Sequence, residues 1–388
     1  MAALTRIGPH GIEPLVLFPG PGVVEEAYRS AGIATRLVPA PRSLLLFNRQ
    51  IQAKSTRERA ELVVRELAPY TLRLARIIRD EGFEAVHCNT SRGMLIAGPA
   101  AKLARRATVL HLRGAPEGLG RGMWLAAQLL ATRIVLVAHA LQDGVDPPFR
   151  RRAIVVHNGV VEQPARDRVA ARRALAERLQ RPALAGSDEP LFVAVSSLTP
   201  FKGLHHLLDA AVIVRERGLA ARYVLAGGGG DERYEAWLRR RVTALGLDEI
   251  VHLIGFVADP LNVMAAADAI VVPSVHRERF DLDGEILDVH GTEGLPRSIL
   301  ESLSLGVPPI ATRVQGVVEQ IDDGTNGLIV PPSDPRALAE ALVRAARDPS
   351  WREAAGEAGR RTARDRFTVD HAAAGLAAAL RAAVEDAR

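Results

Sequence analysis

Two glutamates, Glu293 and Glu301, stand with seven residues between them and give the strongest local signal for chemistry. Pro296 lies between them and predicts a helix start close to Glu293. Amides at a helix start are unpaired donors with partial positive charge, so an anion such as a sugar diphosphate can bind there. Carboxylates beside that start can accept hydrogen bonds from sugar and ribose hydroxyls. For such a pair taken alone, two exposed helix charges are the alternative interpretation.

A lysine can supply the cation for the same diphosphate. Lys202 follows the predicted strand Leu191–Ser196 and precedes Gly203, where a helix is predicted to begin. A lysine between a strand end and a helix N-terminus is well placed to neutralise a diphosphate, although a plain surface lysine is the alternative. Four glycines at 227–230 follow another predicted strand and permit either close backbone approach to a ligand or a flexible turn.

The elements that must position these residues follow an α/β pattern. Short apolar strand candidates alternate with helical stretches, which predicts two Rossmann-like domains with parallel sheets. The predicted ranges are 1–165 for the first domain, 166–189 for a linker, and 190–388 for the second domain with its closing helices. Open α/β sheets bind ligands beyond the carboxyl ends of their strands, so we expect the reaction in the cleft between the domains.

The amino-acid composition limits the classes of partner that the protein is expected to bind. A net charge of +5 and a pI near 9.8 favour an anionic partner such as a nucleotide diphosphate or a phospholipid surface. Aromatic residues make up only 4% of the chain and are not interleaved with basic runs, which argues against single-stranded nucleic acid. The one cysteine, Cys88, excludes an internal disulfide and a cysteine-cluster metal site.

The sequence predicts a cytoplasmic protein. It holds no run of about 18 apolar residues that could span a bilayer. The segment Met1–Pro14 lacks the features of a signal peptide. A predicted helix over Arg57–Asp80 carries apolar residues on one face and arginines mostly elsewhere. Those arginines form either a solvated outer face or a surface that contacts the inner face of an anionic membrane.

Taken together, these segments resemble the retaining glycosyltransferase family 4, which has the GT-B fold of two facing Rossmann-like domains. The resemblance extends from about Pro14 to the C-terminus, and the motifs in this order are more specific together than any one alone. The motifs are Lys202-Gly203, the glycines at 227–230, Leu253–Val257, Val272–Ser274, Glu293–Glu301, Gly306–Pro308 and Asp323–Leu328, with Val156–Val160 upstream.

The resemblance implies roles for the residues around the two glutamates. Lys202 would hold the diphosphate of the donor. Glu293 would contact the transferred sugar, with the amides of Gly294 and Leu295 nearby. Glu301 would hold the ribose hydroxyls.

The resemblance also implies roles for two residues farther away. The backbone near Val257 would read the base. His111 would face the donor sugar, so His111 and Glu293 are the predicted catalytic residues; without the resemblance, a histidine that ends an apolar strand is more often structural. Positioning and stabilisation of the departing diphosphate would supply the catalysis, and neither a metal nor another cofactor is expected.

The implied activity is transfer of a hexose from a nucleotide-diphosphate sugar to a saccharide or lipid-linked acceptor with retention of configuration. Polysaccharide or cell-envelope glycan biosynthesis is the expected setting. Two alternatives stay open: a nucleotide-sugar epimerase with the same fold, and a truncated, non-catalytic nucleotide-sugar-binding module.

Three departures from the family pattern are expected to matter. Only Met1–Gly11 precedes the first predicted strand, so we expect the first domain to lack the opening strand and glycine loop. Ser197 stands where relatives carry an arginine, which weakens the predicted grip on the diphosphate unless Arg297 or another base substitutes. Residues 275–292, which include Asp281 and Asp283, form an insert predicted to be a solvated or acceptor-shaping loop without a metal.

Overall fold

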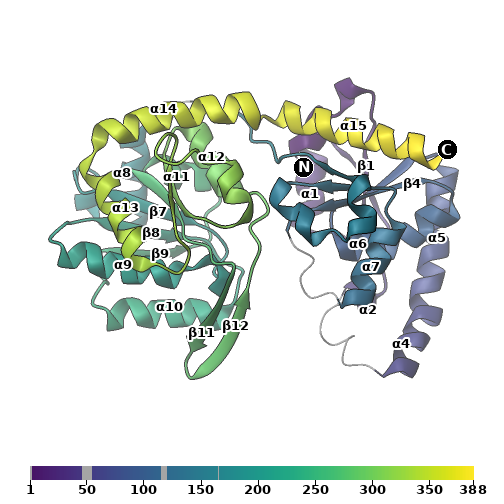
Figure 1. Ribbon diagram of the computed structural model, residues 1–388, viewed down its shortest axis with the longest axis horizontal. Helices are drawn as coiled ribbons and strands as arrows, with labels where there is room; N and C mark the ends of the chain where they lie inside the picture. Colours follow the sequence, from purple (N-terminus) through teal and green to yellow (C-terminus); the bar gives the residue numbers. More distant parts are fainter. Residues whose placement is uncertain (1, 46–54, 115–119, 165) are drawn as a thin grey trace. The chain divides into compact units, whose positions relative to one another are not determined.

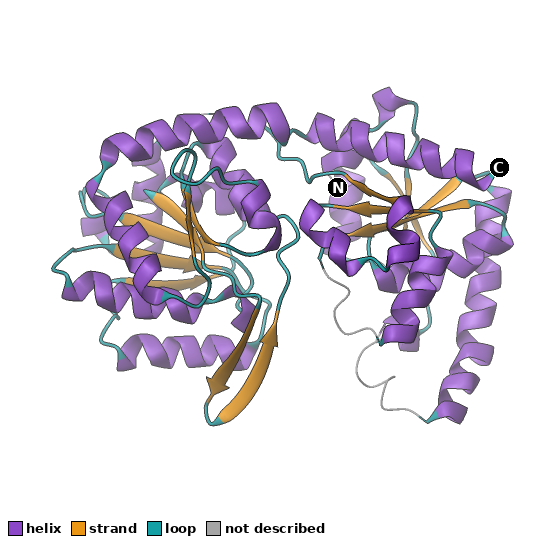
Figure 2. Ribbon diagram, viewed as in Figure 1, coloured by secondary structure: helices purple, strands orange, loops and turns teal. Residues whose placement is uncertain are grey.

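The computed structural model describes residues 2–45, 55–114, 120–164 and 166–388, and the chain divides into two compact units. Unit 1 comprises residues 1–159 and 369–388, and unit 2 comprises residues 160–368. Parallel strands flanked by helices form the body of each unit (Figures 1 and 2). Across the described ranges, no helix has the length and apolar character needed to span a membrane.

Unit 1 holds its strands in two parallel sheets. The smaller sheet pairs β1 (Leu15–Phe18) with β2 (Ala34–Leu37). The larger sheet has the order β3-β4-β5-β6, and its strands are Ala85–Cys88, Ala107–Leu112, Arg133–Leu136 and Ala153–Val155. Every residue of β4 is buried, as expected for a parallel strand covered on both faces.

Unit 1 also contains helices, several of which pack on its two sheets. The helices are α1 (Val23–Ser30), α2 (Arg42–Leu45), α4 (Thr56–Leu62), α5 (Ala68–Asp80), α6 (Ser91–Leu103), α7 (Arg121–Leu130) and α15 (Val369–Ala387). The predicted helix over Arg57–Asp80 is divided into α4 and α5 by a π-helical turn, Val63–Leu67. Pro69, at the start of α5, has no amide proton and so weakens the helical hydrogen bonding there.

The C-terminal helix α15 packs on unit 1 although the helices before it in the sequence belong to unit 2. Small residues of α15, Ala379 and Ala383, lie against Val109 of β4 and Val135 of β5. Alanine at these positions lets the helix backbone approach the sheet closely. The sequence-based range 190–388 placed this helix in the second domain. The division into compact units places it in unit 1, so the predicted and observed boundaries differ at the C-terminus.

Unit 2 contains a six-stranded parallel sheet with the order β14-β13-β10-β7-β8-β9. In chain order its strands are β7 (Leu191–Val195), β8 (Arg222–Ala226), β9 (Val251–Gly255), β10 (Ala269–Val272), β13 (Pro309–Thr312) and β14 (Leu328–Val330). The strand order reverses direction at β7 and β10, as in doubly wound sheets that bind ligands at that point.

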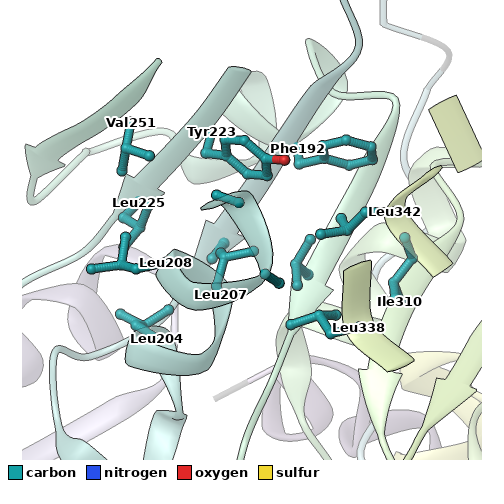
Figure 3. Packing of buried hydrophobic residues seen from close by; sticks show 14 of the residues in the cluster. Phe192, Leu204, Leu207, Leu208, Tyr223, Leu225, Val251, Ile310, Leu338 and Leu342 are labelled. Carbon is teal, nitrogen blue, oxygen red and sulfur yellow. The ribbon is translucent and has the colours of Figure 1, made fainter. Parts of the chain in front are cut away.

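Unit 2 also contains helices, and those over 204–216, 232–244 and 335–347 share one apolar core with the sheet. The helices are α8 (Arg168–Leu179), α9 (Leu204–Glu216), α10 (Glu232–Ala244), α11 (Pro260–Ala265), α12 (Arg297–Leu305), α13 (Pro335–Arg347) and α14 (Pro349–Arg366). Figure 3 shows part of that core, where Leu207 and Leu208 of α9 and Leu342 of α13 lie with Phe192 and Tyr223 of the sheet. Helix α8 lies inside the range 166–189 that was predicted to link the domains.

The insert 275–292 is an antiparallel hairpin and not a loop, which corrects the prediction. Strand β11 (Arg277–Leu282) pairs with β12 (Glu285–His290), and the hairpin extends from the sheet of unit 2 (Figure 1). Asp283 and Gly284 form its turn with positive φ angles of 55° and 86°, as a tight hairpin turn requires. Phe280 and Leu282 are buried in the unit 2 core, which gives the hairpin an apolar anchor.

Candidate functional site

The candidate site of unit 2 lies where the parallel strands end. Lys202 follows β7, Gly227 follows β8, Val257 follows β9 and Ser274 follows β10. Since the carboxyl ends of parallel strands share one edge of the sheet, these residues gather at that edge. The predicted donor-binding residues of this unit therefore belong to one region of the fold.

Lys202 is held by a tight turn between β7 and α9. Residues Pro200–Lys202 form one 3-10 turn, and Gly203 follows with a φ of 65°. A Cβ at Gly203 would lie 2.0 Å from the carbonyl oxygen of Pro273, so a side chain cannot fit there. The Lys202 ammonium lies 4.7 Å from the centre of the Phe201 ring and 2.6 Å from Oε1 of Glu293. The turn thus places a cation directly against the first of the two glutamates.

Glu293 is a buried carboxylate with several partners. Its Oε1 accepts hydrogen bonds from the Lys202 ammonium and, at 2.6 Å, from the hydroxyl of Ser274. Its amide donates to Oε1 of Gln315 at 3.3 Å, and its carbonyl oxygen accepts from the amide of Gly316 at 3.1 Å. Both the side chain and the backbone of Glu293 are therefore fixed in place.

Sequence reasoning assigned no role to Ser274 or Gln315. Ser274 is fully buried, and its hydroxyl lies between the end of β10 and Glu293. A serine directly after an apolar strand in the Val272–Ser274 motif is a signal that could have found it. Gln315 gives no comparable signal, because only the tertiary fold brings it to the amide of Glu293.

The second glutamate lies on helix α12. Gly294 and Leu295 are buried just before the helix, and its N-cap residue Pro296 makes no side-chain hydrogen bond. Glu301 lies one turn into α12, where its Oε1 accepts from Arg297 at 2.8 Å. Burial raises the pKa of Glu301, and the charge of Arg297 partly opposes that effect. Arg297, named above as one base that could substitute for the missing arginine, forms an ion pair with Glu301.

The glycine run serves the packing of the chain on itself. A Cβ at Gly227 would lie 1.7 Å from the carbonyl oxygen of Ser196, and one at Gly230 would lie 2.2 Å from that of Leu198. These two glycines therefore let the turn after β8 approach the turn after β7. The close approach seen in the structure is to the 196–198 segment, and approach of this turn to a ligand stays a prediction.

The segment after β9 is held by an arginine. Arg178 of α8 donates from Nη2 to the carbonyl oxygens of Ile254 and Phe256, at 3.1 and 3.2 Å. Val257, whose backbone was predicted to read the base, is buried, whereas the Phe256 side chain is 79% exposed. The backbone beside Val257 is thus fixed, with an exposed aromatic ring next to it.

His111 belongs to unit 1, where it lies near the end of β4. Its side chain is buried, and its Nδ1 lies 3.1 Å from Nε2 of His87 on β3. Burial lowers the pKa of His111 well below its ordinary value, and the nearby charge of Arg113 lowers it further. The imidazole is therefore neutral at physiological pH and suited to hydrogen bonding.

Among the described residues of unit 2, one cluster offers three metal-ligating atoms within 4.8 Å of one another: His205, His206 and Glu278. The two Nε2 atoms of the histidines lie 2.7 and 2.8 Å from the two carboxylate oxygens of Glu278. Hydrogen bonds alone account for these contacts. Asp283 of the Asp-x-Asp pair forms an ion pair with Arg240.

Comparison with known proteins identifies a matching family and related chains. The family described as glycosyl transferases group 1 matches residues 176–362. The GDP-mannose-dependent alpha-(1-6)-phosphatidylinositol monomannoside mannosyltransferase of Mycolicibacterium smegmatis is 29% identical over 308 residues, which covers 76% of this chain and 75% of the relative. The crystal structure of Anabaena HepE in complex with UDP and glucose is 20% identical, with a TM-score of 0.76 over 98% of this chain and 95% of that chain.

Other relatives are matched over a shorter part of their length. The alpha-D-kanosaminyltransferase of Streptomyces kanamyceticus is 29% identical over 172 residues, covering 44% of this chain and 40% of the relative. The chain spans 34–40% of the length of this and three further curated relatives. The structural match covers nearly all of HepE and gives no support to a missing first βα unit.

The strand-end site, the doubly wound sheet and the sequence match lead to one assignment. Unit 2 carries the family match, and both units are covered by the structural match to HepE. Residues 176–362, most of unit 2, match the glycosyl transferases group 1 family, that is glycosyltransferase family 4, and the chain has the GT-B fold.

Proposed function

We propose that the chain transfers a hexose from a nucleotide-diphosphate sugar to a saccharide or lipid-linked acceptor with retention of configuration, in polysaccharide or cell-envelope glycan synthesis. The observation that carries the proposal is the contact of Lys202 with Glu293 beside the start of α12. A cation and a helix start can hold a diphosphate, and a carboxylate next to them can hold sugar hydroxyls. One relative is a GDP-mannose-dependent mannosyltransferase and one structural neighbour binds UDP and glucose, which supports a donor of this class.

Each predicted residue has a task in the proposed reaction. The Lys202 ammonium neutralises the diphosphate as the bond between the sugar and the phosphate oxygen breaks. Glu293 orients the sugar by accepting hydrogen bonds from its hydroxyls, and the amides of Gly294 and Leu295 lie beside it. Since charge builds up on the leaving diphosphate, preorganised donors there lower the barrier.

The remaining residues set binding and orientation. Glu301 accepts hydrogen bonds from the ribose hydroxyls, and the backbone beside Val257, which Arg178 holds, contacts the base. His111 of unit 1 offers its neutral imidazole to the donor sugar. The acceptor hydroxyl then attacks the face of the sugar that the diphosphate leaves, and its proton passes to the departing phosphate oxygen.

A thermal-shift screen over nucleoside diphosphates and nucleotide sugars tests the binding part, since a ligand that binds the folded state raises the unfolding midpoint. The donor that raises it most is then used in a transfer assay, with the configuration of the product read by NMR. We expect Lys202→Ala and Glu293→Ala to lower turnover by about 100-fold or more. The exposed Lys102 and Glu232 provide the matched controls Lys102→Ala and Glu232→Ala. Full turnover in the site variants, or conversion of the donor to its epimer, would contradict the proposal.

We propose in addition that the exposed arginines of α5 contact an anionic membrane. Arg73, Arg76 and Arg79 are exposed on this helix, and Leu72 beside them is 60% exposed. Basic side chains near an anionic surface contribute about 1 kcal/mol each. Co-sedimentation with phosphatidylglycerol vesicles at low salt should fall when the three arginines are changed to glutamine. Equal co-sedimentation of both proteins would refute this contact.

A further inference from the structure

A second histidine lies behind His111 in unit 1. His87 of β3 pairs in register with Val109 of β4, and Val109 and His111 point to the same face of the sheet because they are two residues apart. The two imidazoles are therefore diagonal neighbours, with ring centres 5.2 Å apart and Nε2 of His87 3.1 Å from Nδ1 of His111. This contact involves Nδ1 of His111, and the other ring nitrogen, Nε2, takes no part in it.

The Nε2 atom of His111 is buried and has no hydrogen-bond partner in the described part of the chain. Buried polar atoms are nearly always paired, so an unpaired one indicates a ligand that the protein alone does not provide. Nearby, Arg113 bridges Asn89 and Asn158 at 3.3 and 3.2 Å, so its charge is held at this end of the sheet. The Nε2 atom of His111 is thus available to form a hydrogen bond with a ligand.

Both histidines are neutral, which limits the proton arrangements to two. Burial lowers the pKa of His87 to about 4, and the charge of Arg113 adds to the effect. Each neutral imidazole carries one N–H, and the 3.1 Å contact needs one donor and one acceptor. Either His87 donates, which leaves an N–H on Nε2 of His111, or His111 donates from Nδ1, which leaves its Nε2 as an acceptor.

We infer that His87 is a positioning residue that accepts a hydrogen bond from Nδ1–H of His111 and keeps the Nε2 atom of His111 free of its proton. Buried N–H groups without a partner are rarer than buried acceptors without one, so the ligand-free protein favours this tautomer. The bare Nε2 then accepts a hydrogen bond from a hydroxyl of the donor sugar. The identity of that ligand rests on the proposed function, whereas the tautomer does not.

Long-range ¹H–¹⁵N NMR of the full chain labelled with ¹⁵N-histidine tests the tautomer without any assay of activity. The His111 signals are assigned by their loss in His111→Gln. We expect the proton on Nδ1 of His111 in the wild-type chain and its return to Nε2, the tautomer favoured by free histidine, in His87→Phe. A proton on Nε2 in the wild-type chain overturns the inference, and this holds even if His87→Phe does not fold, because the assignment needs only His111→Gln.

Kinetics test the positioning role. His87→Phe should lower kcat of sugar transfer about tenfold, the effect of one hydrogen bond, and leave the affinity for the nucleoside diphosphate unchanged. His87→Gln should restore most of kcat, because its Oε1 can accept from Nδ1–H. If both variants lose kcat equally while keeping the unfolding midpoint of the wild-type chain, the role of His87 is refuted. If NMR shows the expected tautomer but neither the wild-type chain nor its variants transfer sugar, the proposed function is refuted and the role of His87 in fixing the tautomer is not.

Discussion

At the scale of single residues, the candidate site depends on a buried ion pair. The side chains of Lys202 and Glu293 are 18% and 8% exposed, so neither charge is well solvated. Burying either charge alone is costly in free energy. The ion pair between Lys202 and Glu293, together with the hydrogen bond from the Ser274 hydroxyl to Glu293, offsets that cost. A diphosphate that binds Lys202 therefore enters a site whose charges are already fixed.

The pair gives a prediction on stability. Lys202→Met should lower the free energy of unfolding by about 3 kcal/mol, because it leaves the Glu293 carboxylate buried without a cation. Adding Glu293→Gln should restore most of the loss, which urea unfolding of the double-mutant cycle would measure. Lys102→Met, at an exposed lysine, should change the value by less than about 0.5 kcal/mol. Strictly additive effects would show that the two side chains do not interact.

The residues of the motif were predictable because their types and order carry the signal. Glu293, Glu301 and Lys202 were found from their spacing beside helix starts. Gln315 was not, since its contact with the Glu293 amide joins positions 22 residues apart in the sequence through the tertiary fold. The roles that the resemblance implies for these residues, and for His111 and Val257, stay predictions.

At the scale of elements, the β11–β12 hairpin is attached to the first turn of α9. The Glu278 carboxylate accepts hydrogen bonds from His205, His206 and Ser333 at 2.7, 2.8 and 2.8 Å. Burial alone would raise the pKa of Glu278, but the hydrogen bonds from the two histidines outweigh it and lower the pKa. Because α9 begins directly after Lys202, the hairpin helps to fix the turn that carries the predicted phosphate-binding lysine.

Glu278→Ala should loosen the hairpin at neutral pH. The carboxylate has a lowered pKa, so its contribution is present above the pKa of an unfolded glutamate and is lost only in acid. We expect the amides of β11 and β12 to lose protection in hydrogen exchange, with a destabilisation of about 1.5–3 kcal/mol. Glu285→Ala, at the exposed end of the hairpin where Glu285 pairs with Arg233, is the control and should leave protection near β11 unchanged. Unchanged protection in Glu278→Ala would exclude the attachment.

The hairpin also shows what the sequence could have revealed. Asp283-Gly284 between segments that contain Phe280, Leu282 and Val289 is a strong hairpin signal, but the acidic residues of the insert favoured a solvated loop.

At the scale of the whole molecule, the alternation of strands and helices was enough to predict two Rossmann-like domains, which the structural match confirms. The return of α15 to unit 1 could not be predicted in this way. Its amphipathic alanine-rich sequence fits a sheet of either unit, and only the packing of Ala379 and Ala383 shows which one it covers.

Histidines whose pKa values are lowered in the folded state should make the chain sensitive to acid. The pKa of His87 is lowered to about 4, so the unfolded state binds more protons than the folded state between about pH 6.5 and 4. Stability is therefore complete above this window and falls as the pH drops through it, by about 3 kcal/mol for His87 at about 1.4 kcal/mol per pKa unit. His111, His205 and His252 have lowered pKa values and act in the same direction.

Urea unfolding at pH 7 and pH 5 would measure this loss. His87→Gln removes one titrating group and should make the dependence of the unfolding free energy on pH less steep. An equal pH dependence in the variant and the wild-type chain would show that His87 does not contribute.

The account depends above all on where the donor binds. The most direct measurement is a crystal structure of the chain with the nucleotide sugar that raises its unfolding midpoint most. We predict the diphosphate within hydrogen-bond distance of the Lys202 ammonium and the start of α12, the ribose at Glu301 and the sugar at Glu293. A donor bound away from the strand ends of unit 2, with Lys202 and Glu293 still paired only to each other, would contradict the account.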